Sequence, residues 1–234
     1  MATKALREVP RRMIIVFLVF VLIFAFFPLL AAGKWDWWQG WAYAIVMLVN
    51  SVLSRVLIAK HHPDLLEERG KTLQHADAKS WDRYLSPLVA TVGPLLILLV
   101  CGLDQRFSLT APFPGWVHVG GLVVIILGTI FSSWALVENR FFSGTVRIQH
   151  ERGHSVVDSG PYRVVRHPGY AGGLLVFLAI PGLLNSIWGI VPALLTAGVM
   201  VLRTALEDRT LQEELPGYQE YARRTRYRLL PGIW

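Results

Sequence analysis

The chain has 234 residues, of which 53% are hydrophobic and 17% charged, and its mean hydropathy is +0.44. Soluble domains carry roughly 25% charged residues, so this composition argues against a soluble fold. The formal net charge is +7. Basic residues that flank apolar segments usually face anionic lipid headgroups, so we expect membrane lipids and not nucleic acid as the partner of this charge.

Four predominantly apolar runs are long enough to cross a membrane, which takes about 20 residues of helix. In chain order they are 13–32, 41–59, 85–103 and 116–137. A cleaved signal peptide is the alternative for the first run, but the run is long for one and further spans follow.

A fifth apolar stretch, 171–206, is interrupted at Pro181, Gly182, Asn185 and Ser186. This pattern predicts a helical hairpin whose first arm, 171–184, is short for a full crossing. The predicted fold class is therefore an all-α, multi-pass membrane bundle of four long helices plus a C-terminal hairpin.

The basic residues predict the orientation of these helices. Twenty of the 23 Lys and Arg residues fall in four segments on one side, 1–12, 60–85, 138–169 and 203–234. The opposite loops contain Lys34 and Arg106, and Arg55 lies near the inner end of its span. Because cytosolic loops are enriched in Lys and Arg, we expect an integral membrane protein with both termini in the cytosol.

We interpret residues 1–234 as one membrane domain, with membrane helices in 1–137 and a cofactor-binding catalytic part in 138–234. The single cysteine, Cys101, lies in an apolar run and has no disulfide partner, and His61 and His62 are adjacent instead of at ligand spacing, so no metal site is predicted. Segment 60–85 is interpreted as a short interfacial helix that connects two spans.

The start of the predicted hairpin carries polar residues. Pro168 fits the first turn of a helix, which places Arg166 and His167 at the helix N-terminus. Free backbone N–H groups and the helix dipole attract a carboxylate there. Gly172 leaves the helix surface bare and permits close approach of a flat ring or of another helix.

A second polar cluster, 203–209, follows the last apolar run. Arg203 and Glu207 are spaced i, i+4 and could pair as a surface salt bridge. Alternatively, the carboxylate of Glu207 holds the ammonium of a ligand whose own carboxylate meets the helix start at Arg166 and His167. Both clusters are expected on the cytosolic side, so one zwitterionic ligand can bridge them.

These segments resemble a known family. Residues 166–172, Arg-His-Pro-Gly-Tyr-Ala-Gly, resemble the R-H-P-x-Y-x-G motif of isoprenylcysteine carboxyl methyltransferases and related membrane phospholipid methyltransferases. Residues 154–162 are similar to the H-x-L-x-x-x-G-x-Y segment that precedes it. Residues 203–211 resemble the R-x-x-x-E-E-x-x-L element, with Asp208 in place of the second Glu. The resemblance covers residues 138–234.

The resemblance implies a pocket for S-adenosylmethionine that opens to the cytosol, and a lipophilic or prenylated methyl acceptor that enters from the bilayer. Arg166 and Arg203 become candidate catalytic residues that orient other groups. The candidate cofactor-binding residues are His154, Gly160, Tyr162, His167, Tyr170, Gly172 and Glu207.

Three other functions remain open at this point. A phosphatidylethanolamine N-methyltransferase would share the cofactor, but its amine must lose a proton, whereas a carboxylate is already ionised at pH 7. An NADPH-dependent membrane sterol or enone reductase has a broadly similar C-terminal region. A non-enzymatic membrane scaffold would bind neither cofactor.

Overall fold

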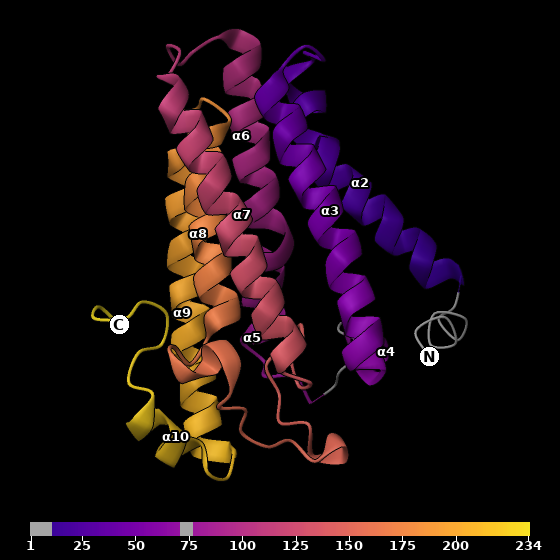
Figure 1. Cartoon of the computed structure of the whole chain (residues 1–234), viewed down its shortest axis with the longest axis vertical. Coiled ribbons are helices and arrows are strands. Elements are labelled where there is room, and N and C mark those ends of the chain that lie inside the picture. Colours follow the sequence, from indigo (N-terminus) through magenta and orange to yellow (C-terminus); the bar gives the residue numbers. More distant parts are fainter. Residues whose placement is uncertain (1–10, 71–76) are drawn as a thin grey trace.

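The computed structural model describes residues 11–70 and 77–234, so Lys4, Arg7 and Lys71 of the predicted basic segments lie outside the described chain. The described residues form helices and connecting loops with no strand, which confirms the predicted all-α class (Figure 1). The α-helices are α2 (Arg11–Ala32), α3 (Trp38–His61), α4 (Pro63–Gly70), α5 (Asp82–Pro87), α6 (Gly93–Phe107), α7 (Gly115–Glu138), α8 (Pro168–Leu183), α9 (Ile190–Glu214) and α10 (Tyr218–Arg224).

Five long helical segments of the described chain are apolar enough to cross a membrane, and each of the four long predicted runs overlaps one of them. Helix α8 is shorter, with 16 residues. At 1.5 Å per residue it is about 24 Å long, which is less than the roughly 30 Å of a hydrocarbon core. The prediction of a short first arm in the C-terminal hairpin is therefore confirmed.

The third span is longer than the predicted 85–103. It runs from Asp82 to Phe107, because a π-helical turn, Leu88–Val92, joins α5 to α6 without a break. Pro87 and Pro94 lie on either side of this turn. Proline has no backbone N–H to donate, and a local π-turn lets the helix continue past the missing hydrogen bonds.

The hairpin also differs from its predicted boundaries. Pro181 lies inside α8, and the chain reverses at 184–189, where Asn185 adopts a left-handed conformation with φ of 57°. Helix α9 continues past the end of the apolar stretch at residue 206 and ends at Glu214. Glu207 and Asp208 therefore lie on the same continuous helix as Arg203, as their predicted helical spacing requires.

Small residues let α7 and α8 pack closely. A Cβ atom on Gly128 of α7 would lie 2.7 Å from the carbonyl oxygen of Gly172 on α8. A Cβ on Gly172 would overlap the carbonyl oxygen of Gly128 and the side chain of Ser132. This contact fixes α8, and with it the polar residues at its start, against the bundle.

A buried carboxylate ties the hairpin to the bundle at the end opposite the C-terminus. Asp104 accepts hydrogen bonds from the backbone N–H of Thr110 at 2.8 Å and from the Ser186 hydroxyl at 2.6 Å. The Ser186 Oγ also accepts the N–H of Gly189 at 2.9 Å. Asp104 is 2% exposed, so these bonds are shielded from water and hold the reversal between α8 and α9 in place.

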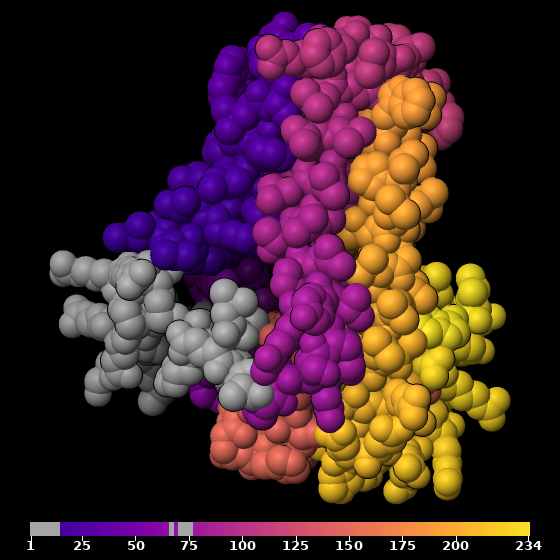
Figure 2. Space-filling model, turned by 180° about the vertical axis from the view of Figure 1, so that it is seen from behind, coloured from indigo at the N-terminus to yellow at the C-terminus, as the bar shows by residue number. Residues whose placement is uncertain are grey.

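Helix α2 packs on α6 only toward that same end. Leu29 and Ala32 are buried there, and Gly102 of α6 contacts the α2 backbone. Toward the other end α2 leans away from the bundle, and the surface is recessed between α2 and α5–α6 (Figures 1 and 2). Apolar residues 15–23 are exposed around most of the helix circumference. Below, the end of the bundle that carries α4, α10 and the C-terminus is called the cavity end.

Candidate active site

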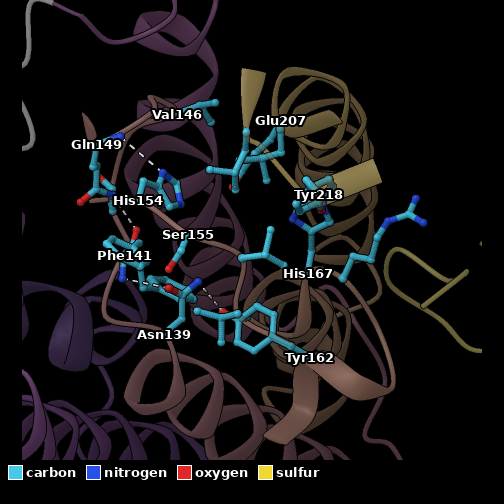
Figure 3. A pocket seen from close by; sticks show the side chains of 18 of the residues that line it. Asn139, Phe141, Val146, Gln149, His154, Ser155, Tyr162, His167, Glu207 and Tyr218 are labelled. Atoms are coloured by element: carbon cyan, nitrogen blue, oxygen red, sulfur yellow. Dashed lines mark hydrogen bonds between the residues drawn. The ribbon is translucent and has the colours of Figure 1, made fainter. Parts of the chain in front are cut away.

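A cavity lies at the cavity end, between the 139–157 loop, the start of α8, the last turns of α9 and α10 (Figure 3). Its empty space, counted together with the open solvent at its mouth, is about 790 Å³. The predicted site residues that line it are His154, Tyr162, Arg166, His167, Tyr170 and Glu207. Residues separated by more than 50 positions in the sequence are thus brought to one place.

The start of α8 forms one wall of the cavity. His167 is the N-cap residue but makes no side-chain capping hydrogen bond, and Pro168 occupies the first turn, as predicted. The backbone N–H of Arg166 donates to Tyr227 O at 2.9 Å, and that of His167 donates to Arg228 O at 2.9 Å. The C-terminal segment therefore runs alongside the Arg166–His167 pair and holds it in place.

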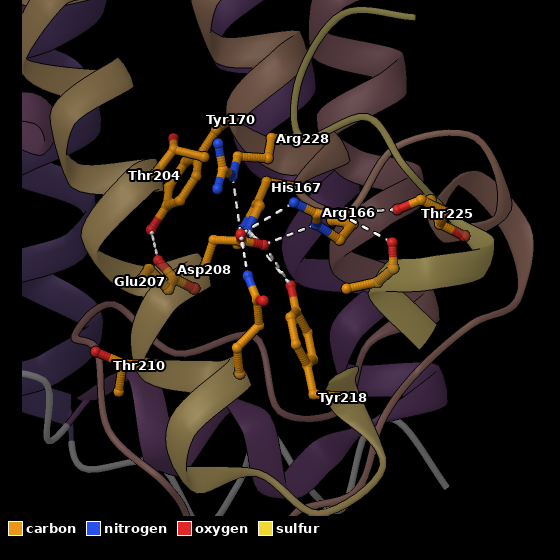
Figure 4. Close-up of polar contacts among 12 residues, drawn as sticks. Arg166, His167, Tyr170, Thr204, Glu207, Asp208, Thr210, Tyr218, Thr225 and Arg228 are labelled. Carbon is orange, nitrogen blue, oxygen red and sulfur yellow. Dashed lines mark hydrogen bonds and ion pairs between the residues drawn. The ribbon is translucent and has the colours of Figure 1, made fainter. Parts of the chain in front are cut away.

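Asp208 connects the start of α8 to α9 and to the C-terminal segment (Figure 4). Its carboxylate accepts two bonds from Arg166, from Nε at 2.7 Å and from Nη2 at 3.0 Å. It also accepts Arg228 Nε at 2.8 Å and the Tyr218 hydroxyl at 3.1 Å, and lies 3.3 Å from His167 Nε2. Asp208 is fully buried. The shorter acid in the Glu-Asp pair, whose role the sequence left in doubt, is the centre of this network.

The guanidinium of Arg166 is occupied by protein groups. Besides Asp208, its Nη1 donates to the carbonyl oxygens of Ala222 at 3.3 Å, Thr225 at 3.0 Å and Arg226 at 3.1 Å. Its geometry is that of a positioning residue that joins α8, α9 and α10.

Arg203 and Glu207 do not pair with each other within the described chain. Arg203 instead makes a two-bond ion pair with Asp82, from Nε to Oδ1 at 2.7 Å and from Nη2 to Oδ2 at 3.1 Å. It also donates to the hydroxyl of Tyr170, which in turn donates to Glu207 Oε2 at 2.6 Å. Arg203 is 5% exposed and does not line the cavity, so it acts on the site through Tyr170.

Glu207 is half-buried and lines the cavity. Tyr170 occupies one of its carboxylate oxygens, and the other has no hydrogen-bond partner among the described residues. The cavity therefore contains a carboxylate oxygen of Glu207, from α9, and the uncapped N-terminus of α8. This is the pairing that a zwitterionic ligand requires.

His154 lines the opposite wall of the cavity. Its ring lies 4.6 Å from the ring of Phe141 between centroids, and its Nδ1 accepts the backbone N–H of Gln149 at 3.3 Å. Burial and the nearby charges of Arg147 and Arg152 lower the pKa of His154 to about 4. The ring is therefore neutral at pH 7, and with Nδ1 as acceptor its Nε2 carries the proton and can donate.

Tyr162 joins the cavity floor to α7. Its hydroxyl donates to Ala135 O at 3.3 Å and accepts from Asn139 Nδ2 at 3.2 Å, while its carbonyl oxygen accepts the Tyr221 hydroxyl at 2.7 Å. Burial raises the pKa of Tyr162, so the phenol stays protonated. Asn139, Phe141 and Gln149 are cavity residues that the sequence analysis did not single out.

The two predicted glycines do not line the cavity. Gly160 has a positive φ of 53°, and a Cβ there would lie 2.8 Å from the carboxyl group of Glu138, so glycine is required by the backbone. Gly172 faces α7, as described above. From the sequence, either a flat ring or another helix was expected to approach the bare surface at Gly172. In the structure helix α7 makes this approach and fills the space that a ring would need.

Segment 60–85 is more than the connector that the sequence suggested. Arg147 lines the cavity and is paired with Glu68 of α4 at 2.9 Å, with Asp77 at 2.8 Å and with Glu151 at 2.6 Å. Asp82, fully buried, accepts the backbone N–H of Val146 at 2.7 Å. The carboxylates of Glu68, Asp77 and Asp82 therefore hold the cavity loop in place.

The chain was compared with known proteins. A family model described as Phospholipid methyltransferase matches residues 116–216. Protein-S-isoprenylcysteine O-methyltransferase B of Arabidopsis thaliana is 32% identical over 148 residues, which cover 60% of this chain and 75% of that protein. Protein-S-isoprenylcysteine O-methyltransferase A of the same plant is 35% identical over 97 residues, 39% of this chain and 49% of that protein. Cobalt-zinc-cadmium resistance protein CzcN of Cupriavidus metallidurans is 32% identical over 108 residues, 45% of each chain.

The family model covers the sequence motifs and most of the cavity. It spans the region from α7 to the end of α9. The first relative is matched over 75% of its length at 32% identity. The chain therefore belongs to the isoprenylcysteine O-methyltransferase family of membrane methyltransferases.

Proposed function

We propose that this methyltransferase uses S-adenosylmethionine to methylate the carboxylate of a prenylated cysteine or a similar lipid-attached acid, on the cytosolic face of a membrane. The observation that carries the proposal is the convergence of the α8 start and Glu207 on one cavity. The excess of basic residues at the cavity end supports a cytosolic orientation, with both termini on that side.

The cavity residues fit the proposed cofactor. Glu207 offers a carboxylate oxygen for the ammonium group, and the uncapped start of α8 offers N–H groups and a positive dipole for the carboxylate. Neutral His154 offers a donor beside the ring of Phe141. The Thr145 hydroxyl lines the cavity, is buried and has no partner among the described residues, which a polar ligand would supply.

When bound, S-adenosylmethionine would supply a methyl group on a positively charged sulfur, so that an ionised oxygen could bond to the methyl carbon while the sulfur leaves as a neutral thioether. The protein's contribution is alignment, which can lower a barrier by several kcal/mol. Tyr170 fixes the rotamer of Glu207, and Arg203 fixes Tyr170. Asp208 and Arg166 keep α8 and α9 at the separation that one ligand can bridge. No residue needs to act as a base, because the acceptor carboxylate is already ionised.

Phosphatidylethanolamine N-methylation is a second candidate, since the matching family model is described as Phospholipid methyltransferase. An amine acceptor needs a base near the methyl group. Among the described residues, the carboxylate that lines the cavity is that of Glu207, which accepts the Tyr170 hydroxyl, and His154 is a weak base because its pKa is lowered to about 4. This favours the acid acceptor over the amine.

A single assay separates these functions. The purified protein in nanodiscs is incubated with methyl-tritiated S-adenosylmethionine and either a farnesylated cysteine acid or phosphatidylethanolamine. We expect label that mild base releases as volatile methanol from the first acceptor. Base-stable label in the second would establish the N-methyltransferase instead, and no transfer to either, with NADPH raising the melting temperature, would favour the reductase.

A further inference from the structure

Asp82 is a buried carboxylate outside the region that the family model matches. It is the first residue of α5, whereas that region begins at residue 116. Asp82 is fully buried and accepts Arg203 Nε at 2.7 Å, Arg203 Nη2 at 3.1 Å and the Val146 N–H at 2.7 Å. Because a buried charge is costly unless it is paired, each residue of this ion pair needs the other. Asp82 does not line the cavity, so it can act on a ligand only through the residues that it holds.

Arg203 also lies close to a second acid, Glu207. The two residues are four positions apart on α9, and side chains at this spacing can meet on one face of a helix. Both contact the hydroxyl of Tyr170, which accepts from Arg203 Nη1 and donates to Glu207 Oε2 at 2.6 Å. Figure 4 shows the second of these bonds. One hydroxyl group therefore stands between the guanidinium and the carboxylate, and a change of side-chain rotamers is enough to bring them together.

The partners of Arg203 determine whether Glu207 stays available to a ligand. Asp82 and the Gly144 carbonyl oxygen, which accepts Nη2 at 3.0 Å, engage Nε and Nη2 of Arg203. Among the described residues, Glu207 is left without a direct ion pair, and its second carboxylate oxygen has no hydrogen-bond partner. A direct bond from Arg203 would occupy that oxygen and compensate its charge, so that neither would remain for an ammonium group in the cavity.

We propose that Asp82 is a positioning residue that keeps Glu207 available for the cofactor's ammonium group by holding Arg203 in a separate ion pair. The inference rests on the proposed function, because the proposed cofactor supplies the ammonium. Without the charge of Asp82, Arg203 is a buried cation that has lost its counter-ion, and Glu207 is a carboxylate within its reach on the same helix. Arg203 then pairs with Glu207, and the site loses the charge that attracts the ammonium.

The test compares two ligands that differ only in the ammonium group. S-adenosylhomocysteine has the same amino-acid portion as the methyl donor, and its desamino analogue has a hydrogen in place of the ammonium. Their dissociation constants are measured by titration of the protein in nanodiscs. One charge-assisted hydrogen bond corresponds to a preference of roughly 10- to 100-fold for the parent compound.

We expect this preference in the wild type and its loss in Asp82→Asn, although asparagine keeps an oxygen for the Val146 N–H. The double variant Asp82→Asn/Arg203→Met should recover most of the preference, because the competing cation is absent. A purely structural role of Asp82 predicts no such recovery, since the second substitution would not repair a disturbed loop.

Asp104→Asn is the matched control, because Asp104 is also buried and lies in the same membrane-spanning segment at its opposite end. It should lower the melting temperature, as Asp82→Asn does, but keep the preference for the parent compound. This control separates a general loss of stability from a specific loss of the ammonium site.

An unaltered preference in Asp82→Asn overturns the inference and leaves the proposed function intact. A loss that the double variant does not recover also overturns it, because Arg203 would then not be the competitor of the cofactor. A wild type that binds both compounds equally, or neither of them, contradicts the proposed grip on the cofactor, and the inference fails with it.

Discussion

Replacing Asp208 with Asn tests the network that joins α8 to α9. The substitution keeps the shape of the side chain but removes its charge, which leaves Arg166 without a counter-ion at a position that is 8% exposed. The amide also has only one acceptor oxygen, whereas the carboxylate uses both, for Arg166 Nε and Nη2. Its NH₂ group would face a guanidinium donor.

Breaking a buried ion pair by removing one partner costs about 3–5 kcal/mol. For a chain of this size, each kcal/mol shifts the melting temperature by roughly 2–4 °C, so we expect a loss of roughly 6–20 °C. The measurement is thermal unfolding in nanodiscs, monitored by tryptophan fluorescence and compared at one heating rate.

Glu213→Gln provides the control, because it makes the same chemical change on the same helix. Glu213 pairs with Arg209 on the surface, with side chains 56% and 76% exposed, and such pairs contribute about 0–1 kcal/mol. A shift for Asp208→Asn no larger than that for Glu213→Gln would refute the assignment of Asp208 as the centre of the network.

Two further predictions concern packing and pH. Gly172→Ala should destabilise the protein by about 1–3 kcal/mol in thermal unfolding, because the new Cβ would overlap Gly128. Gly198→Ala is the control: it has open space around it and should be neutral or slightly stabilising. Equal shifts of the melting temperature in the two variants would contradict this prediction. The pKa of His154 is about 4 in the folded protein and about 6.5 in the unfolded chain. Between pH 4 and pH 6.5 the unfolded chain therefore binds more protons than the folded protein. The free energy of unfolding should consequently fall as the pH falls from about 6.5 to about 4. His154→Gln should flatten that part of the pH profile, and an unchanged slope would show that other groups cause it.

The spans and the motif segments could be predicted from the sequence because each rests on a local pattern. A run of about 20 apolar residues fixes a membrane helix whatever its neighbours are. Pro168 likewise fixes the start of α8 within a residue. The polar start of α8 and the 203–209 cluster were predicted on one side of the membrane, and His167 and Glu207 line the same cavity.

The partners of the charged residues could not be predicted in the same way. Spacing alone suggested that Arg203 pairs with Glu207, but Arg203 reaches Asp82, 121 positions away. Only the packing of α5 against α9 brings these two together, and nothing local in 60–85 reveals it. A possible signal was the position of Asp82, three residues before the apolar run 85–103, because a carboxylate that becomes buried at such a place requires a partner.

Affinity for S-adenosylmethionine in Glu207→Gln tests the central claim most directly. Glutamine keeps an acceptor for the Tyr170 hydroxyl, so the melting temperature without ligand should not change. Loss of the charge should weaken binding by roughly 10- to 100-fold, the equivalent of one charge-assisted bond, while Glu213→Gln binds as the wild type does. An affinity in Glu207→Gln equal to that of the wild type would contradict a cofactor held between α8 and α9.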